Sequence, residues 1–361
     1  MHVTRLRIRD LRRLQEVELA PGPGLNLLIG DNGAGKTSIL EALHLMAYGR
    51  SFRGRVRDGL VRTGAAALEV YLEWHQTDDD RDRRAGLRHA GPSWEGRLDG
   101  QPVTQLGDLC AALAVVTFEP GSHALVGGSG EPRRRFMDWG LFHVEQEFLP
   151  LWRRYARALR QRNALLKSGA PGGELDVWDR ELVAAGEPLT GFRQAYLEIL
   201  EEALAATAAR IAPSLGAASL RFQPGWRREA MPLADALLLA RDRDRVLGHT
   251  TTGPHRADWR VDFAAMPGAE ALSRGQAKLA ALSCLLAQAQ DLAGRLGDWP
   301  VVALDDLASE LDAGHRRRVL ETLGESGAQA FVTGTDASAL TLGEELQGVV
   351  FHVEQGGVGP A

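Results

Sequence analysis

The sequence predicts an α/β fold: a mixed β core with flanking helices, into which a helical lobe is inserted. Three observations support this prediction. Strand-like and helix-like segments alternate near both ends of the chain. Residues 131–212 instead carry apolar side chains at helical spacing. The chain has 361 residues, which is long enough for two lobes. We therefore expect both ends of the chain to belong to one α/β core and the middle of the chain to form an inserted helical lobe.

The first predicted elements are strands and one helix. Residues 3–9 (VTRLRIR) alternate apolar and basic side chains, as in a half-buried strand. Residues 25–29 (LNLLI) follow a PGPG turn and form an apolar run typical of a buried strand. Residues 38–49 repeat apolar side chains at helical spacing and end in glycine, which suits the end of a helix. Residues 68–74 (LEVYLEW) are again strand-like.

The middle of the chain is predicted to be helical, and its last third returns to alternating elements. Residues 136–167 carry an apolar stripe at 3–4 spacing, and SGAPGG (168–173) breaks the pattern. A second helical stretch is expected near 190–212. Further on we expect a helix at 276–292 and strands at 300–304, 328–334 and 348–354.

Composition and charge disfavour several classes of protein. Hydrophobic residues make up 44% of the chain and charged residues 25%, as in ordinary globular proteins. Cys110 and Cys284 form no CxxC pair, which argues against a disulfide scaffold or a zinc ribbon. The N-terminus is too charged for a signal peptide, and no apolar run is long enough to span a membrane. We therefore expect a cytoplasmic protein that does not enter membranes.

A phosphate-binding motif lies between the second predicted strand and the first predicted helix. GDNGAGKT fits G-x-x-x-x-G-K-[ST], whose glycines let backbone N–H groups turn toward phosphate oxygens. Lys36 can reach the β and γ phosphates, and the Thr37 hydroxyl can bind Mg²⁺. A chance glycine turn before a helix is the alternative. We predict ATP and Mg²⁺ as cofactors, bound by Gly30, Asp31, Asn32, Gly33, Ala34, Gly35, Lys36 and Thr37.

The apolar run VVALDD (301–306) supplies the second half of such a site. A buried strand that ends in carboxylates can place them opposite bound phosphates. Asp305 is the candidate Mg²⁺ contact, and Asp306 is the candidate that polarises the attacking water. Together with Lys36 they are the predicted catalytic residues. Two acids that merely end a strand in a turn are the alternative.

The segment LSRGQAK (272–278) predicts a second anion-binding helix start. Ser273 and Gly275 lie where a helix begins and where backbone N–H groups are free. One phosphate group needs only one such loop, so we expect these residues to contact nucleotide held by a second copy. The order of motifs resembles the ATP-binding-cassette class, in which this signature caps the partner's γ-phosphate. Thr333 and Thr335 lie where that class has its γ-phosphate sensor, usually a histidine.

The chain as a whole resembles the RecF family of bacterial recombination-repair ATPases. After GPHR that family commonly has two acids, whereas here Ala257 precedes Asp258. His255 is expected to fix a loop or to touch phosphate. The segments that carry the resemblance are GRSFR (49–53), EPRRRFMD (131–138), YARALRQRNALLK (155–167), TTGPHR (251–256), LSRGQAK (272–278), LDDLASELD (304–312) and FVTGTD (331–336).

The resemblance implies an ATPase head like that of SMC proteins, without a long coiled coil. It implies an ATP-driven homodimer on DNA that helps RecO and RecR load RecA at gaps or junctions, in DNA replication, repair and the SOS response. We expect residues 1–125 to form the first part of the ATPase lobe and 126–245 a DNA-facing helical lobe. Residues 246–361 then hold the signature, the acidic strand and the remainder of the ATPase lobe.

Candidate DNA contacts are arginines, because guanidinium groups bind phosphates without reading sequence. Arg153, Arg157 and Arg160 recur at i, i+4 and i+7 and share one helix face. A solvated face, or pairing with the acidic stretch 174–202, is the alternative. Further candidates are Arg133, Arg134 and Arg135 just upstream, a weaker patch at Arg5, Arg7 and Arg9, and Arg12 near the nucleotide.

We expect weak, DNA-stimulated ATP hydrolysis. Asp306 is one methylene shorter than the glutamate usual in transporter cassettes and holds the attacking water less well. One alternative is a binding switch in which hydrolysis is incidental. A second is an ATP-coupled nuclease of the overcoming-lysogenization type, which needs a further acidic metal-binding domain. A third is a transporter ATPase, disfavoured because about 235 residues separate Lys36 from Ser273.

Overall fold

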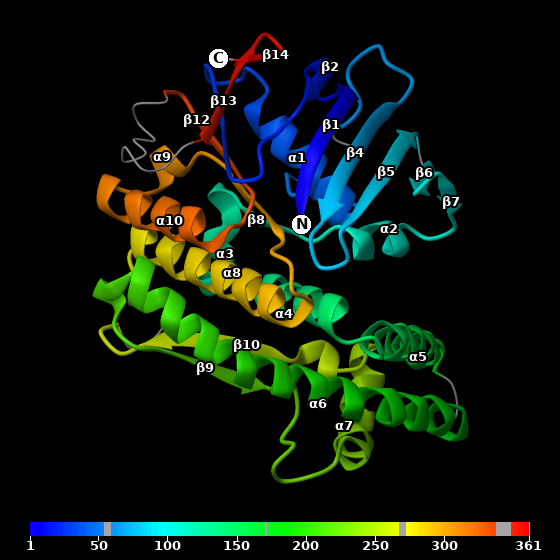
Figure 1. Cartoon of the computed structure of the whole chain (residues 1–361). Coiled ribbons are helices and arrows are strands. Elements are labelled where there is room, and N and C mark those ends of the chain that lie inside the picture. Colours follow the sequence, from blue (N-terminus) through cyan, green and yellow to red (C-terminus); the bar gives the residue numbers. More distant parts are fainter. Residues whose placement is uncertain (54–58, 92, 170–171, 267–271, 337–347, 361) are drawn as a thin grey trace. The chain divides into compact units, whose positions relative to one another are not determined.

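The computed structural model describes residues 1–53, 59–91, 93–169, 172–266, 272–336 and 348–360, and it divides into two compact units (Figure 1). Unit 1 comprises Met1–Ser122, Thr207–Pro213 and Ser273–Ala361, and unit 2 comprises His123–Ala206 and Ser214–Leu272. Unit 2 therefore takes in residues 246–272, which the sequence assigned to the returning ATPase segment. None of the described helices is both long and apolar enough to cross a membrane.

The central sheet of unit 1 positions the predicted nucleotide motifs. Its described strands run in the order β14-β13-β3-β12-β11-β8, and all neighbours pair in parallel except β14 and β13. The runs LNLLI, VVAL and AFVTG are entirely buried, as parallel strands covered on both faces require. The strands are β3 (Leu25–Ile29), β8 (Val115–Phe118), β11 (Val301–Leu304), β12 (Ala330–Gly334), β13 (Gly348–Glu354) and β14 (Gly357–Pro360).

A second, antiparallel sheet of unit 1 alternates buried and exposed side chains. Its order within the described residues is β2-β1-β4-β5-β6-β7. Leu6 and Ile8 face the core, whereas Arg5, Arg7 and Arg9 face outward. The strands are β1 (His2–Leu11), β2 (Leu14–Leu19), β4 (Leu68–Gln76), β5 (Arg81–Ala90), β6 (Ser93–Leu98) and β7 (Gln101–Val103).

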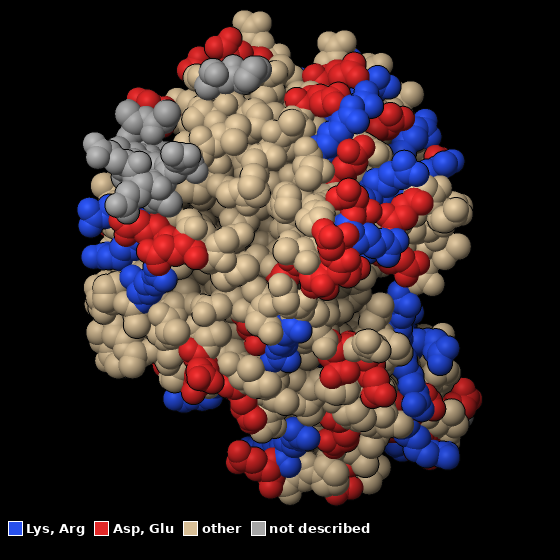
Figure 2. Space-filling model, viewed as in Figure 1, with Lys and Arg blue, Asp and Glu red and all other residues tan. Residues whose placement is uncertain are grey.

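The outward arginines of β1 do not form a basic patch. Arg5 pairs with Glu18 at 2.6 Å, and Arg9 pairs with Glu16 at 3.0 Å. Arg7 lies 3.3 Å from Glu18. Figure 2 shows the result as interleaved acidic and basic side chains over the part of unit 1 that carries β1, β4 and β5. Cross-strand glutamates thus offset the positive charge of the weaker DNA patch expected on this strand, and DNA binding there stays a prediction.

Helices complete unit 1. Helix α1 (Lys36–Tyr48) is buried along most of its length and shares one hydrophobic core with side chains from both sheets. Helix α8 (Arg274–Leu296) starts at the signature segment, and the short α9 (Leu307–Glu310) follows Asp306 directly. The remaining helices assigned wholly to this unit are α2 (Leu106–Ala112) and α10 (Ala313–Ser326).

Unit 2 is mostly helical, as expected, but its elements differ in detail. Helix α6 (Gly172–Ile211) starts well before the predicted residue 190 and contains Pro188, and its last residues belong to unit 1. A two-stranded sheet of β9 (Ala218–Gln223) and β10 (Asp258–Phe263) was not predicted. The helices of this unit are α3 (Ala124–Gly127), α4 (Gly130–Val144), α5 (Phe148–Ser168), most of α6, and α7 (Leu233–Leu247).

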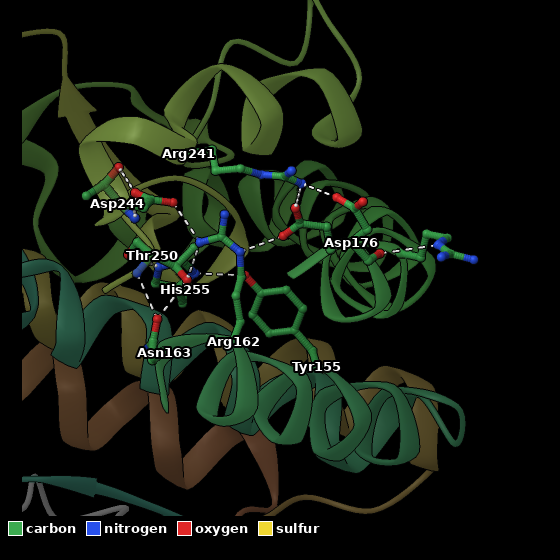
Figure 3. A network of polar contacts seen from close by, with 11 residues as sticks. Tyr155, Arg162, Asn163, Asp176, Arg241, Asp244, Thr250 and His255 are labelled. Carbon is green, nitrogen blue, oxygen red and sulfur yellow. Dashed lines mark hydrogen bonds and ion pairs between the residues drawn. The ribbon is translucent and has the colours of Figure 1, made fainter. Parts of the chain in front are cut away.

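A buried polar network joins α5, α6, α7 and the TTGPHR loop (Figure 3). The fully buried Arg162 donates to Asp179 at 2.5 Å, to Asp244 at 2.7 Å and to Thr250 at 2.9 Å. Because a buried guanidinium needs charged partners, the carboxylates on α6 and α7 fix the position of α5.

His255 fixes the same loop. Its Nε2 lies 3.0 Å from the Thr250 carbonyl and its Nδ1 lies 2.7 Å from the Tyr155 hydroxyl. Burial lowers the pKa of His255 to about 4, so the ring is neutral near pH 7. A neutral ring that donates from Nε2 to the carbonyl accepts a hydrogen bond from the tyrosine hydroxyl at Nδ1. Of the two roles expected for His255, the structure shows the loop-fixing one.

Candidate nucleotide site and candidate DNA-facing helix

The phosphate-loop motif runs from the end of β3 to the first turn of α1. Gly30 lies so close to β13 that a Cβ would come 2.1 Å from the Val353 carbonyl oxygen. Gly35 has a φ of 119°, and a Cβ there would meet the Leu14 side chain at 2.6 Å. Only glycine fits these two positions, so the loop can bend tightly before the helix. Its N–H groups then precede the positive end of the α1 dipole.

Lys36 lies over this loop. Its Nζ donates to the Gly30 carbonyl at 2.6 Å and to the Asp31 carbonyl at 2.9 Å. Burial lowers the pKa of Lys36, and the nearby carboxylates of Asp306 and Asp305 oppose that shift. The side chain is therefore held beside the phosphate loop, and its contact with phosphates stays a prediction.

Thr37, Asp305 and Thr333 meet at the carboxyl ends of adjacent parallel strands. Oδ1 of Asp305 accepts one hydrogen bond from the Thr37 hydroxyl and one from the Thr333 hydroxyl, both at 2.9 Å. Asp305 is buried, and this burial raises its pKa despite the two hydroxyl donors. Mg²⁺ is usually held by one or two carboxylates together with substrate phosphates and waters, so these oxygen donors fit that ion.

Asp306 adopts a strained backbone conformation between β11 and α9. Its φ of 53° lies in the left-handed region, which costs about 1–3 kcal/mol for a residue other than glycine. The Asp306 N–H donates to the Thr333 hydroxyl at 2.7 Å, which helps to hold that conformation. Thr333, expected at a sensor position, thus contacts both predicted acids. Thr335 is exposed and does not line the site.

These residues line one open cavity of about 710 Å³ in unit 1. Sequence reasoning missed several of its lining residues, although GRSFR (49–53) was already conspicuous as a motif. Arg12 lines the cavity but is held by the fully buried Glu41, through hydrogen bonds of 3.0 and 2.8 Å. The lining residues not assigned from sequence are Arg13, Ser38, Phe52, Arg53, Gly59, Val61, Thr63, Glu119 and Pro120.

The signature segment lies at an exposed helix start. Ser273 caps α8: its hydroxyl accepts from the Gln276 N–H at 3.3 Å, and the Gln276 side chain accepts from the Ser273 N–H at 2.9 Å. This capping box was not foreseen in detail, but its residues are those that the motif supplies. Neither Ser273 nor Gly275 is among the described residues that line the cavity.

Arg133 is not available to DNA, which corrects the sequence-based prediction. It is 8% exposed and forms two hydrogen bonds to Asp258, of 2.6 and 2.9 Å. The neighbouring Arg134 donates to the carbonyl of the fully buried Ala257, and the exposed Arg135 pairs with Glu131. The sequence could not distinguish these roles, because three adjacent helical residues point in three directions.

The three arginines on α5 are placed differently. Arg153, Arg157 and Arg160 are exposed, and within the described part of the chain none of them forms an ion pair. Arg154 instead pairs with Glu181 of α6, at 2.8 Å. The alternative of pairing with the acidic stretch thus applies to Arg154 and to the buried Arg162, which binds Asp179.

Comparisons with known proteins agree with this architecture. The family model described as "RecF/RecN/SMC N terminal domain" matches residues 2–357. The DNA replication and repair protein RecF of Stenotrophomonas maltophilia is 65% identical over 358 residues, which is 98% of each chain. The protein of the same name from Xanthomonas axonopodis pv. citri is 63% identical over 364 residues, which is 99% of this chain and 98% of that one.

Solved structures extend the comparison to the fold. A RecF–ATP complex described as a recombination mediator in the RecFOR pathway matches with a TM-score of 0.88. It is 24% identical, and the match covers 100% of this chain and 97% of that one. An SMC head bound to a winged-helix domain of ScpA matches with a TM-score of 0.61 at 14% identity, over 99% and 96% of the chains. The predicted fold class is therefore confirmed.

Proposed function

We propose, from the premise that this chain belongs to the RecF family of DNA replication and repair proteins, that it is an ATP-dependent DNA-binding protein. In this proposal ATP and Mg²⁺ occupy the cavity of unit 1, and two copies pair around the nucleotides. The pair binds DNA without regard to sequence and hydrolyses ATP slowly. A cytoplasmic location belongs to the same proposal.

One observation carries the proposal. Lys36, Thr37, Asp305 and Asp306 line the same cavity, whereas Ser273 and Gly275 do not. A nucleotide bound in this cavity alone would therefore have no contact with Ser273 or Gly275. The N–H groups at the exposed start of α8 can donate hydrogen bonds to an anion, so a second copy can supply what the first copy's cavity lacks.

Each residue of the cavity is assigned a role from its position. Lys36 brings positive charge to the phosphates, and the loop N–H groups orient them. Thr37 and Asp305 hold Mg²⁺, which neutralises charge on the phosphates when it is bound. Asp306 orients the attacking water, and its backbone is held by the first turn of α9, where the N–H groups of Ser309 and Glu310 donate to the Asp306 carbonyl at 3.0 and 3.1 Å. The short Asp306 side chain supports slow turnover, because it reaches the water less well than a glutamate.

DNA binding is assigned to the exposed face of α5. Arg153, Arg157 and Arg160 are exposed and form no ion pair with the carboxylates that the structure describes, which supports contact with a polyanion. Arg135 and Arg134 remain secondary candidates. The RecFOR pathway named for the solved relative supports RecO and RecR as partners and RecA loading as the outcome.

Nucleotide titrations of the full chain test the proposal. ATP with Mg²⁺ should bind with one site per chain and should double the mass seen by light scattering. Lys36→Met should lose both effects. A chain that binds ATP but never pairs would contradict the pairing of two copies around the nucleotides.

A pure binding switch is the second candidate, and Asp306→Asn distinguishes it. If ATP hydrolysis releases the protein from DNA, Asp306→Asn should remain bound to DNA. If hydrolysis is incidental, the substitution should not change the time that the protein stays on DNA. Among the described residues there is no group of three or more His, Cys, Asp or Glu side chains that could hold a metal ion. No observation therefore favours the nuclease alternative.

A further inference from the structure

Trp152 is an exposed aromatic residue on the arginine-bearing helix α5. The buried stripe of this helix includes Tyr155, Ala158 and Leu166, and Trp152 lies beside that stripe with 42% of its surface exposed. A tryptophan can bury more apolar area than most side chains, so leaving it exposed forgoes stabilisation. The helix has placed its largest aromatic ring where a ligand could cover it.

The charges around Trp152 point to a polyanion. Arg153, Arg157 and Arg160 have no ion pair within the described residues, whereas the adjacent Arg154 is neutralised by Glu181. Figure 2 shows basic side chains along the edge of unit 2 that carries α5 in Figure 1. Three guanidinium groups on about two helical turns favour contacts with successive phosphates.

A shallow groove connects the ring with these charges. It has a volume of about 500 Å³ and is lined by Pro150, Trp152, Arg153, Arg154, Ala156, Arg157 and Arg160. Trp152, Ala156 and Arg160 follow one another at i, i+4 and i+8, so they lie in one row along the helix. Between Trp152 and Arg160 this row has only the methyl group of Ala156, the smallest side chain that lines the groove.

We propose that Trp152 stacks against an unpaired nucleic-acid base while Arg153, Arg157 and Arg160 contact the backbone. The α5 face then prefers single-stranded DNA to duplex. In a duplex the bases are stacked on each other and their faces are not accessible, whereas every unpaired base offers one. This inference rests on the proposed DNA-binding role of α5 and adds a residue that selects the strand class.

The test is fluorescence anisotropy of the full chain with fluorescein-labelled dT20 and with a labelled 20-base-pair duplex. Base stacking is worth about 1–3 kcal/mol, so Trp152→Ala should weaken dT20 binding by about fivefold to 150-fold. Duplex binding should change by less than about twofold. Trp152→Phe should restore most of the dT20 affinity, because phenylalanine retains an aromatic face. Leu239→Ala, at an exposed apolar position on α7, is the matched control and should change neither.

Two outcomes would count against the inference, and they are distinguishable. Equal weakening of both ligands by Trp152→Ala, or no weakening of either, overturns the stacking role. If the triple variant Arg153→Ala/Arg157→Ala/Arg160→Ala binds both DNA ligands more weakly than the parent chain, the DNA-binding role of α5 is retained. If that triple variant binds both ligands as tightly as the parent chain, the location of DNA on α5 is wrong as well. Melting temperatures of all variants establish that each is folded.

Discussion

The Thr37 hydroxyl donates a 2.9 Å hydrogen bond to Oδ1 of Asp305, although the two residues are 268 positions apart in sequence. The contact follows from the sheet. Strands β3 and β11 both pair with β12 in parallel, so their carboxyl ends lie at the same edge. Asp305 directly follows β11, and Thr37 lies in the first turn of α1 after the phosphate loop that leaves β3, so both lie at this edge, where Thr333 of β12 completes the contact.

Replacing the buried carboxylate should stabilise the fold. Burial raises the pKa of Asp305 above its ordinary value of 3.8, so the ionised form is disfavoured in the native state. Stability is then lost as pH rises from the ordinary value through the raised one. Asp305→Asn keeps a hydrogen-bond acceptor but removes the charge, and it should raise the free energy of unfolding at pH 7 in urea titrations without Mg²⁺.

The matched control for this prediction is Asp312→Asn. Asp312 caps α10 and accepts from the His315 N–H at 3.0 Å, and its pKa is lowered by that contact. Its substitution should bring no gain in stability at pH 7. If Asp305→Asn is no more stable than the parent chain, burial does not disfavour the ionised form of Asp305 in the native state.

Lys36 and Thr37 should affect nucleotide binding in different ways. A charged hydrogen bond contributes about 1.5–3 kcal/mol, so Lys36→Met should weaken ATP binding by about tenfold or more. Thr37→Val should weaken binding only when Mg²⁺ is present, because its hydroxyl serves the ion. Calorimetric titrations with Mg²⁺ and with EDTA check both. An equal effect of Thr37→Val under the two conditions would contradict its assignment.

Asp306→Asn should slow ATP hydrolysis and leave ATP affinity nearly unchanged. An amide cannot take a proton from the attacking water, while the backbone position is kept by the Thr333 hydroxyl. Single-turnover hydrolysis and equilibrium binding separate the two effects. A parent chain that hydrolyses many ATP molecules per second would contradict the slow hydrolysis attributed to Asp306.

Alanine substitution of two arginines of unit 2 should affect different properties: stability for Arg133 and DNA binding for Arg157. Arg133→Ala leaves Asp258 without its partner, and breaking a buried ion pair costs about 3–5 kcal/mol. Arg157→Ala, on the exposed face of α5, should change stability by less than about 0.5 kcal/mol. Urea unfolding measures the first effect, and DNA binding should fall for Arg157→Ala. Similar stability of the two variants would contradict the placement of Arg133.

Sequence reasoning was most successful where one motif determines one local structure. GDNGAGKT requires glycine at Gly30 and Gly35 for steric reasons, so the loop could be recognised before any fold was known. The strand that ends just before Asp305 was recognisable from its buried apolar run. In both cases the information is contiguous in sequence.

What sequence reasoning missed depends on contacts between distant segments. The β9–β10 sheet pairs residues about 40 positions apart, and each strand alone is short. The first half of α6 precedes the predicted start near residue 190, and it contains Pro188, which lacks the N–H of a regular helical residue. Arg133 is identical in type to its neighbours, and only the position of Asp258 shows that it is structural.

The most direct test of the central claim is light scattering of the parent chain and of Ser273→Arg, with and without ATP and Mg²⁺. The claim is that the exposed start of α8 completes the nucleotide site of a second copy. The parent chain should pair with ATP, and Ser273→Arg should stay monomeric while still binding ATP through Lys36. Pairing of Ser273→Arg to the same extent as the parent, or loss of ATP binding by the monomeric variant, would contradict the claim.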